Sequence, residues 1–563
     1  RGLLMNFIKK YKAVILIVLF ALIIRLINLD KTGGLWYDEI NIYSIASQSF
    51  PAGMLKADAH RFLLFPLYYL IYHLWITLFG NSDLVIRLMS VFFDILSIVA
   101  AFFAGKTLGE FLEKDEKFNI RTGTIYALLY AVNSSFIYYA QEAKFYSLTF
   151  FLINLLIIFW LKFLKNTDKK HFWLFYITNI LLIYTYTSQI LFTLLVYGVT
   201  MVYFAAGSRF KENFKYLLIL LSAYIPLAIF AIYIKHYFSG NFDAVVYDNS
   251  FILLAVQNYF SPVLAGVQNN ILDFQNILMK GMFNFKFWLF VMYPVLLILG
   301  GICISLKKYN ISRYIIAVPL LYLAFHITAS NLSYYKVLVR YTLMILPLLL
   351  LLASAGICAI KNIKLQNTLL IFYVIISILG IFTINGAVNI KRPDGYREVA
   401  EALIANSVNP QADFVLPIRV GLLDKYYKIQ GEKFSLYILN EEEAQKTYLT
   451  VEEINGIKND KQNLHKYYRR YLLTNTPDKN FENYIRKEFL KSNDVVIITD
   501  RTISMFTGEQ IRMIIHSGNY EKFPIQFLRL SKLNNDLLYT ASKNLKLKQH
   551  LNVKNWEIFV FGI

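Results

Sequence analysis

The chain has 563 residues, of which 57% are hydrophobic and 17% charged, and its mean hydropathy is +0.45. A soluble domain is typically about 45–50% apolar and about 25% charged, so this composition excludes an ordinary soluble protein. The formal net charge is +20. In a membrane protein, lysines and arginines clustered beside the spans set the topology, so this charge does not require a nucleic-acid partner.

Apolar stretches of about 20 residues, long enough to cross a bilayer, recur along the first two-thirds of the chain. The first lacks a small-residue cleavage site, so we expect a retained span rather than a signal peptide. Asp94, a lone acid in the second span, is expected to pair inside the bundle. The expected spans are 13–29, 83–105, 120–140, 143–162, 172–187, 188–206, 215–236, 287–306, 312–329, 337–359 and 366–388.

One further apolar stretch, 62–80, decides which side of the membrane every later loop faces. If it crosses, the basic loops near 162–170, 209–215 and 307–313 face outward, against the positive-inside rule. We therefore expect an interfacial helix at 62–80. The result is about 11 spans with an extracytoplasmic C-terminus. The outer loop at 237–286 is long, and loops of that length are usually functional or contain short helices.

The composition changes after residue 390, where charges become dense and long apolar runs stop. The pattern predicts a helix at 396–406 and strands at 413–418, 493–500 and 557–563. These elements indicate a soluble α/β domain of about 170 residues, roughly one ordinary domain. The predicted domains are thus a transmembrane domain, 1–389, and an extracytoplasmic domain, 390–563.

This topology gathers polar residues on the outer face of the membrane. Asp38 and Glu39 follow the first span, and Asp58, His60 and Arg61 close the same loop. Later outer turns carry Gln141, Glu142, Lys144, Thr187, Gln189, Tyr335, Lys336 and Arg340. Ionisable groups at membrane depth are costly, so the gathering points to a functional site.

Each of these residues also has a simpler explanation. Asp38 can cap an interfacial helix, and Glu39 suits a first-turn acid or an orienting group. His60 can be an ordinary interfacial histidine, while Arg61 and Arg340 can anchor to lipid phosphates. On spacing alone, the structural and catalytic interpretations of Asp38 are about equally good.

Several kinds of chemistry are not predicted. No histidine or cysteine cluster has the spacing of a metal site, and neither a GxxxxGK[ST] nor a GxGxxG motif occurs, so we expect no metal and no nucleotide-driven transport. The two cysteines, Cys303 and Cys358, lie in apolar runs and imply no disulfide framework.

A set of motifs follows one order along the chain: WYDEI at 36–40, the stretch 66–90, QEAKFYSL at 141–148, TSQILFTLL at 187–195, RYTLMILPLLLLLASAGI at 340–357 and PDGYREVAEAL at 393–403. Together they resemble the GT-C superfamily of membrane glycosyltransferases, in the branch of protein O-mannosyltransferases and the aminoarabinose transferase that acts on lipid A. The resemblance implies an α-helical polytopic bundle with interfacial helices and a C-terminal α/β domain.

The chain departs from this family at two motifs. The family's interfacial helix often opens His-Pro-Pro-Leu-Tyr-Tyr, whereas Leu64, Phe65 and Pro66 stand here, with His60 shortly before them. The arginine of the family's QEARPY motif is Lys144, a cation without the bidentate fork of a guanidinium.

The resemblance implies an inverting glycosyltransferase of the bacterial cytoplasmic membrane, which moves a sugar from a polyprenyl-phosphate carrier to an acceptor hydroxyl on the outer side. Asp38 is implied as the general base, with Glu39 orienting it or contacting the acceptor. The leaving phosphate needs fixed cations, for which Arg340 is the first candidate. The other candidate substrate-binding residues are Arg61, Lys336, His60, Gln141, Glu142, Lys144, Gln189 and Tyr335. No cofactor is expected besides the lipid-linked sugar; the other partners are membrane lipids and a protein, lipid or glycan acceptor.

Two other functions remain open. A lipid or polysaccharide flippase performs no chemistry and would place polar groups along the full depth of the bundle, for alternating access. An O-antigen-type ligase or polymerase shares the carrier lipid and the outer-face chemistry, so only its acceptor distinguishes it.

Overall fold

The computed structural model describes residues 2–30, 34–113, 115–207, 209–225, 288–333, 339–382, 387–388, 395–416, 423–435, 494–500, 525–554 and 556–562. The chain divides into two compact units. The helical unit comprises Arg1–Thr32 and Ile45–Ile390, and the C-terminal unit comprises Gly33–Ser44 and Lys391–Ile563. The segment 33–44, which carries Asp38 and Glu39, is therefore grouped with the C-terminal part of the chain and not with the spans that flank it.

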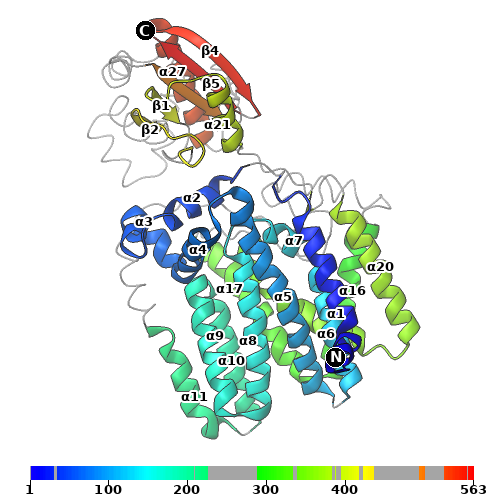
Figure 1. Cartoon of the computed structure of the whole chain (residues 1–563). Coiled ribbons are helices and arrows are strands. Elements are labelled where there is room, and N and C mark those ends of the chain that lie inside the picture. Colours follow the sequence, from blue (N-terminus) through cyan, green and yellow to red (C-terminus); the bar gives the residue numbers. More distant parts are fainter. Residues whose placement is uncertain are drawn as a thin grey trace. The chain divides into compact units, whose positions relative to one another are not determined.

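The described part of the helical unit is almost entirely helical (Figure 1). Its helices are α1 (Gly2–Leu26), α3 (Ala52–Leu64), α4 (Pro66–Phe79), α5 (Asp83–Leu112), α6 (Glu116–Ala131), α7 (Ser134–Ala140), α8 (Tyr146–Asn166), α9 (Lys169–Thr185), α10 (Gln189–Ala206), α11 (Phe210–Ser222), η1 (Trp288–Met292), α16 (Tyr293–Lys308), α17 (Asn310–Ser333), α18 (Val339–Thr342), η2 (Leu343–Ile345), α19 (Leu346–Cys358) and α20 (Ile363–Ile381).

Six helices in the described part of the chain are long and apolar enough to cross a membrane: α5, α8, α10, Leu289–Lys308, Asn310–Thr328 and α20. The mostly helical fold class is confirmed, whereas the count of about 11 spans stays a prediction. The outer loop 237–286 and the second half of the span 215–236 lie outside the described residues.

Two expected elements are divided in the structure. The span 120–140 is two helices: α6 ends at Ala131, and Asn133 caps α7. The Asn133 side-chain oxygen accepts from the backbone N–H of Ser135 at 3.0 Å and of Phe136 at 3.3 Å. The stretch 62–80 breaks at Phe65, and α4 begins at Pro66. The 14 residues of α4 extend about 21 Å, less than the hydrocarbon thickness of about 30 Å, so α4 alone is too short to cross.

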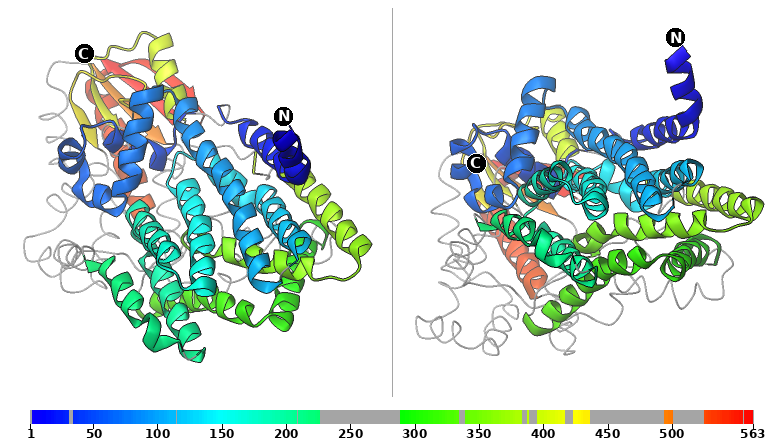
Figure 2. Two further views of the ribbon diagram at one scale, coloured as in Figure 1. Left: turned by 60° about the horizontal axis from the view of Figure 1, so that its bottom comes forward. Right: turned by 90° about the horizontal axis from the view of Figure 1, so that it is seen from below.

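The helices pack closely where glycines replace larger side chains. α8, α9 and α10 lie side by side (Figures 1 and 2), and α5 packs against both α6 and α8. A Cβ on Gly105 of α5 would lie 2.8 Å from the Cα of Gly123 of α6, and one on Gly301 of α16 would lie 2.7 Å from the carbonyl oxygen of Ala353 of α19. Both crossings therefore bring backbone against backbone.

A buried ion pair lies inside the helical unit. Arg25 of α1 donates to Asp94 of α5, both side chains are fully buried, and Arg25 also donates to the Ala131 carbonyl at 2.9 Å. Tyr130 donates to the second Asp94 oxygen at 3.1 Å, and Ser97 donates to Tyr130 at 2.9 Å. The prediction that Asp94 pairs within the bundle is confirmed, and the pair ties α1, α5 and α6 together.

The C-terminal unit contains a five-stranded sheet of order β2-β1-β3-β5-β4. Its elements are α2 (Tyr37–Ala46, of which Tyr37–Ser44 belong here), α21 (Tyr396–Ala405), β1 (Asp413–Leu416), β2 (Lys433–Ser435), β3 (Val495–Asp500), α27 (Ile525–Asn544), β4 (Lys546–Val553) and β5 (Trp556–Gly562). β1 pairs in parallel with β2 and β3, while β5 is antiparallel to β3 and β4.

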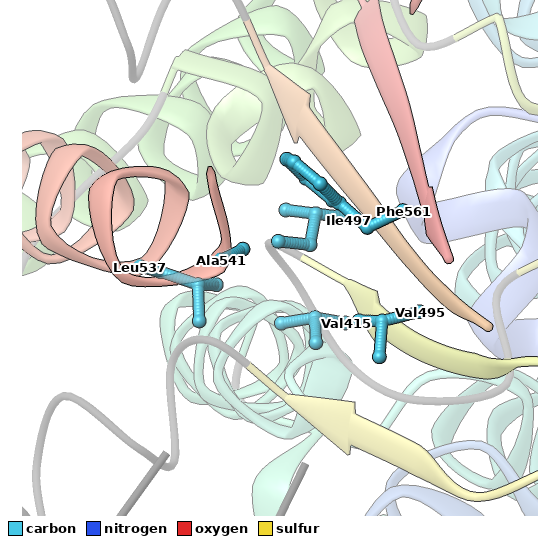
Figure 3. Packing of buried hydrophobic residues seen from close by; sticks show 6 residues of the cluster. All are labelled: Val415, Val495, Ile497, Leu537, Ala541 and Phe561. Atoms are coloured by element: carbon cyan, nitrogen blue, oxygen red, sulfur yellow. The ribbon is translucent and has the colours of Figure 1, made fainter. Parts of the chain in front are cut away.

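One hydrophobic cluster of this sheet lies on the face that α27 covers. Figure 3 shows Leu537 and Ala541 of α27 facing Val415, Val495, Ile497 and Phe561 of β1, β3 and β5, all of which are buried. The helix and the three strands predicted from the sequence are confirmed as α21, β1, β3 and β5. The α/β character of this part of the chain follows from the same apolar residues that marked it in the sequence.

Candidate active site

The turn between α7 and α8 carries three buried polar side chains. Gln141, Glu142 and Lys144 are 2%, 1% and 5% exposed. The Gln141 amide donates to the carbonyl oxygens of Arg25 at 3.1 Å and Ile27 at 2.7 Å, which fixes the turn to the end of α1. The Lys144 Nζ lies 4.0 Å from a Glu142 carboxylate oxygen. The turn therefore holds a positive and a negative charge in a buried position.

Aromatic side chains form a wall beside this turn. Phe145 stacks on Phe65 with ring centroids 4.6 Å apart, and both rings contact Tyr186, at 4.3 and 5.4 Å. The backbone N–H of Thr187 donates to the Leu64 carbonyl at 3.1 Å. The α3–α4 break, the start of α8 and the α9–α10 turn are thereby joined into one region of the helical unit.

Arg340 is linked to the same region through Tyr146. Arg340 lies in the short helix α18 and is half-buried. The phenol of Tyr146, at the start of α8, lies within electrostatic range of both Arg340 and Glu142. The Lys144 Nζ is 5.8 Å from the centroid of the same ring. Lys144, Arg340 and Glu142 thus all act electrostatically on one tyrosine, which the sequence did not single out.

Gln189 opens α10 within this part of the helical unit. Its side chain is 0% exposed, and neither the oxygen nor the nitrogen of its amide has a hydrogen-bond partner among the described residues. A buried amide without partners costs free energy, so such a group is typical of a site that a polar ligand completes. A sugar hydroxyl, which both donates and accepts, matches the amide.

Arg61 has a partner within its own helix. Its Nε lies 3.4 Å from Asp58, and the two side chains are 26% and 28% exposed. Burial raises the pKa of the neighbouring Tyr69 phenol, an effect that the Arg61 charge opposes and the Asp58 charge supports. The pair with Asp58 neutralises part of the Arg61 charge.

Asp38 and Glu39 lie in the first turn of α2, in the C-terminal unit. The Glu39 carboxylate is buried and accepts from the backbone N–H of Trp36 at 3.1 Å. A glutamate at the third helical position that binds back to the residue before the helix is half of a capping box. Glu39 thus fixes the start of α2, and the neighbouring half-buried Asp38 is held in place by the helix it opens.

The remaining candidates are only partly described. His60 lies in α3, with its side chain outside the described part of the chain; Tyr335 and Lys336 lie outside it altogether. Among the residues that the structure describes, no three His, Cys, Asp or Glu side chains gather as a metal site would require. Asp38 belongs to the C-terminal unit, whereas Lys144 and Arg340 belong to the helical unit. A common site for Asp38 and Arg340 therefore stays a prediction.

No family model and no curated protein matches the sequence. Two crystal structures are similar to the chain over nearly its whole length. One is ArnT from Cupriavidus metallidurans in the apo state, with a TM-score of 0.54, 10% identity and coverage of 97% of each chain. The other is ArnT from the same organism bound to undecaprenyl phosphate, with a TM-score of 0.52, 11% identity and coverage of 98% of each chain. The chain therefore has the same fold as these two ArnT structures.

Proposed function

We propose that the chain is an inverting glycosyltransferase that moves a sugar from a polyprenyl-phosphate carrier to an acceptor hydroxyl. The observation that carries this proposal is the buried polar cluster of Gln141, Glu142 and Lys144. Lys144 lies near the Tyr146 ring, and Arg340 acts electrostatically on the same tyrosine. The fold adds support, since one structure with the same fold is bound to undecaprenyl phosphate.

In the proposed reaction, the Asp38 carboxylate takes the proton of the acceptor hydroxyl while that oxygen attacks the anomeric carbon. The bond between the anomeric carbon and the carrier's phosphate oxygen breaks, and the phosphate leaves with the bonding electrons. Arg340 and Lys144 stabilise the charge that develops on it. Gln141, Glu142 and Gln189 bind sugar hydroxyls, and one direct displacement inverts the anomeric centre.

The proposed site faces the outer side of the bacterial cytoplasmic membrane, with the C-terminal unit extracytoplasmic. The basis is the positive-inside rule, because lysines and arginines gather at the opposite helix ends. The lipid-linked sugar is the co-substrate, and the acceptor is a protein, a lipid or a glycan. Transfer to a growing glycan would make the enzyme a ligase or polymerase, which an acceptor screen distinguishes.

The arrangement of the buried polar network argues against a flippase. Asn154 of α8 donates to Ser97 at 3.0 Å, and Tyr126 donates to Asn154 at 2.6 Å, which extends the Arg25–Asp94 network across four helices. All these side chains are fully buried and bonded to one another. A polar path for a headgroup would present such groups to an open cavity, whereas these serve to join the helices.

The test combines transfer with carrier binding in the purified protein. Asp38→Asn should abolish the release of undecaprenyl phosphate from its pentose- and hexose-linked forms, because the amide cannot accept the proton, and should leave undecaprenyl phosphate binding unchanged. Arg340→Ala should weaken that binding about tenfold or more, the typical loss of a charge-assisted bond to phosphate.

Arg209→Ala provides the matched control, since Arg209 lies beyond the other end of α10 with its guanidinium 5.6 Å from the Tyr203 ring. Its carrier affinity should equal that of the wild type. Retained turnover in Asp38→Asn would remove the general base from the mechanism, and equal affinities of Arg340→Ala and Arg209→Ala would leave Arg340 as a lipid anchor only.

A further inference from the structure

The segment that carries Asp38 is held by one turn of the C-terminal unit, Leu423–Tyr427. The backbone N–H of Leu35, a fully buried residue, donates to the hydroxyl of Tyr426 at 2.7 Å. Leu35 lies just before α2, on the chain that leads into Asp38. A side chain far along the sequence thus satisfies a backbone group at the start of the proposed catalytic helix.

The contact requires close approach of the two chains. A Cβ on Gly34 would lie 2.7 Å from the Cβ of Arg397, in α21, and 3.1 Å from the Tyr426 hydroxyl. No larger residue fits there without displacing Arg397 or the hydroxyl, so glycine lets the backbone of 34–35 lie directly against the C-terminal unit.

A second contact holds α2 further along. The Lys425 Nζ lies 4.8 Å from the centroid of the Tyr43 ring and 4.9 Å from that of Tyr426. An ammonium group between two aromatic rings attracts both. The neighbouring residues Lys425 and Tyr426 therefore hold the segment 34–44 at both ends, one before Asp38 and one after it.

The turn that makes these contacts is itself anchored. The backbone N–H groups of Tyr426 and Tyr427 both donate to the Leu423 carbonyl at 2.9 Å. The Tyr427 hydroxyl donates to the Val408 carbonyl at 2.7 Å, and its ring lies 5.8 Å from that of Phe414 in β1. Tyr427 therefore fixes the turn to Val408 and to strand β1.

We infer that Tyr426 and Lys425 are positioning residues, through which the C-terminal unit fixes the orientation of Asp38. The inference rests on the proposed function, in which Asp38 is the general base. A general base acts only within hydrogen-bond reach of the proton that it takes, and a misplacement of about 1 Å can reduce the rate about a hundredfold. The role of the C-terminal unit is then to hold the α2 carboxylate in a productive orientation, without touching the reacting atoms itself.

The decisive variant is Tyr426→Phe in the full-length protein. It keeps the ring and removes the oxygen to which the Leu35 N–H donates. Hydrogen exchange in peptides covering 34–44 should accelerate about fivefold, because a typical hydrogen bond is lost from a buried donor. The kcat of undecaprenyl phosphate release should fall about tenfold, with the KM for the lipid-linked donor within twofold of the wild-type value.

Tyr539→Phe is the matched control, since it also removes one tyrosine hydroxyl from the C-terminal unit, but from an exposed side chain of α27. It should leave exchange in 34–44 and kcat unchanged. Lys425→Gln should lower kcat as Tyr426→Phe does, and Lys425→Arg, which restores a cation between the rings, should recover it.

Unchanged exchange in 34–44 of Tyr426→Phe would overturn the inference, whatever the reaction. Faster exchange with full kcat would overturn it as well, because the orientation of Asp38 would then not limit the rate. Failure of the proposed function shows separately, as turnover retained by Asp38→Asn.

Discussion

Arg25 and Asp94 meet in the interior of the helical unit, where an uncompensated charge is most expensive. The sequence predicted that Asp94 would pair inside the bundle, but it did not identify Arg25. The two residues are 69 positions apart, on helices whose neighbourhood only the tertiary fold determines. Arg25 also donates to Ala131, next to the break that leads into α7, so the pair supports the region where the candidate site begins.

Asp94→Asn should destabilise the protein by about 3–5 kcal/mol, because it leaves the guanidinium buried without its counter-charge. The check is thermal unfolding of the purified protein in detergent, followed by tryptophan fluorescence. The double variant Arg25→Met/Asp94→Leu removes both charges and should be much closer to the wild-type stability. If the single variant unfolds at the wild-type temperature, the pair is not what holds α1 against α5.

In the candidate site, the sequence predicted which polar residues would be buried but not which side chains they would contact. QEAKFY predicted polar groups near membrane depth, and Gln141, Glu142 and Lys144 are indeed buried together. The pairing of Arg61 with Asp58 was not predicted, because it depends on side-chain geometry within α3. The electrostatic influence of Arg340 on Tyr146 was not predicted either, because it depends on how distant helices pack. Asn133, whose side chain caps α7, was a recognisable signal inside a stretch that its hydropathy presented as one span.

At the scale of elements, close helix packing explains where the glycines of α16 stand. Gly301 faces the backbone of α19, whereas a Cβ on the adjacent Gly300 would meet nothing within 4 Å. Gly301 therefore permits close packing of α16 against α19, whereas Gly300 makes no such contact. The strands were more predictable than these crossings, because β-branched and aromatic runs such as Val495–Asp500 specify their own conformation.

Gly301→Ala should destabilise the protein by roughly 1–3 kcal/mol, the usual cost of overpacking, because its methyl group would press on the Ala353 carbonyl. Gly300→Ala should be neutral or stabilising by up to about 1 kcal/mol, since alanine is the better helix former and has free space there. Melting temperatures of the two variants, measured side by side, give the comparison. Equal effects would mean that α16 and α19 can separate at little cost.

For the whole molecule, the division into two units was the least predictable feature. The sequence predicted a boundary near residue 390, and local hydropathy assigned 33–44 to an outer loop of the membrane domain. The structure groups that segment with residues 391–563. Hydrophobic periodicity reports local conformation and burial, but it carries no information on which distant segment a short polar helix will pack against.

The topology makes a prediction at this scale. A tag attached after Ile563 should be cleaved by protease added to intact spheroplasts, because the basic loops place the C-terminus outside. A tag inserted at Ser208, in the basic loop before α11, serves as the control and should be cleaved only after the membrane is opened. Protection of the C-terminal tag in spheroplasts would reverse the topology and place the candidate site on the cytoplasmic side.

The grouping of residues 33–44 with 391–563 also constrains how the protein is made. Translation adds about 5–20 residues per second, so the segment with Asp38 emerges from the ribosome on the order of tens of seconds before Arg397 and Tyr426 exist. During that interval the nascent helices can insert and assemble, but the Leu35 N–H has no hydroxyl to bind. The loop with the carboxylate can therefore reach its final arrangement only after the chain has been made through Tyr426.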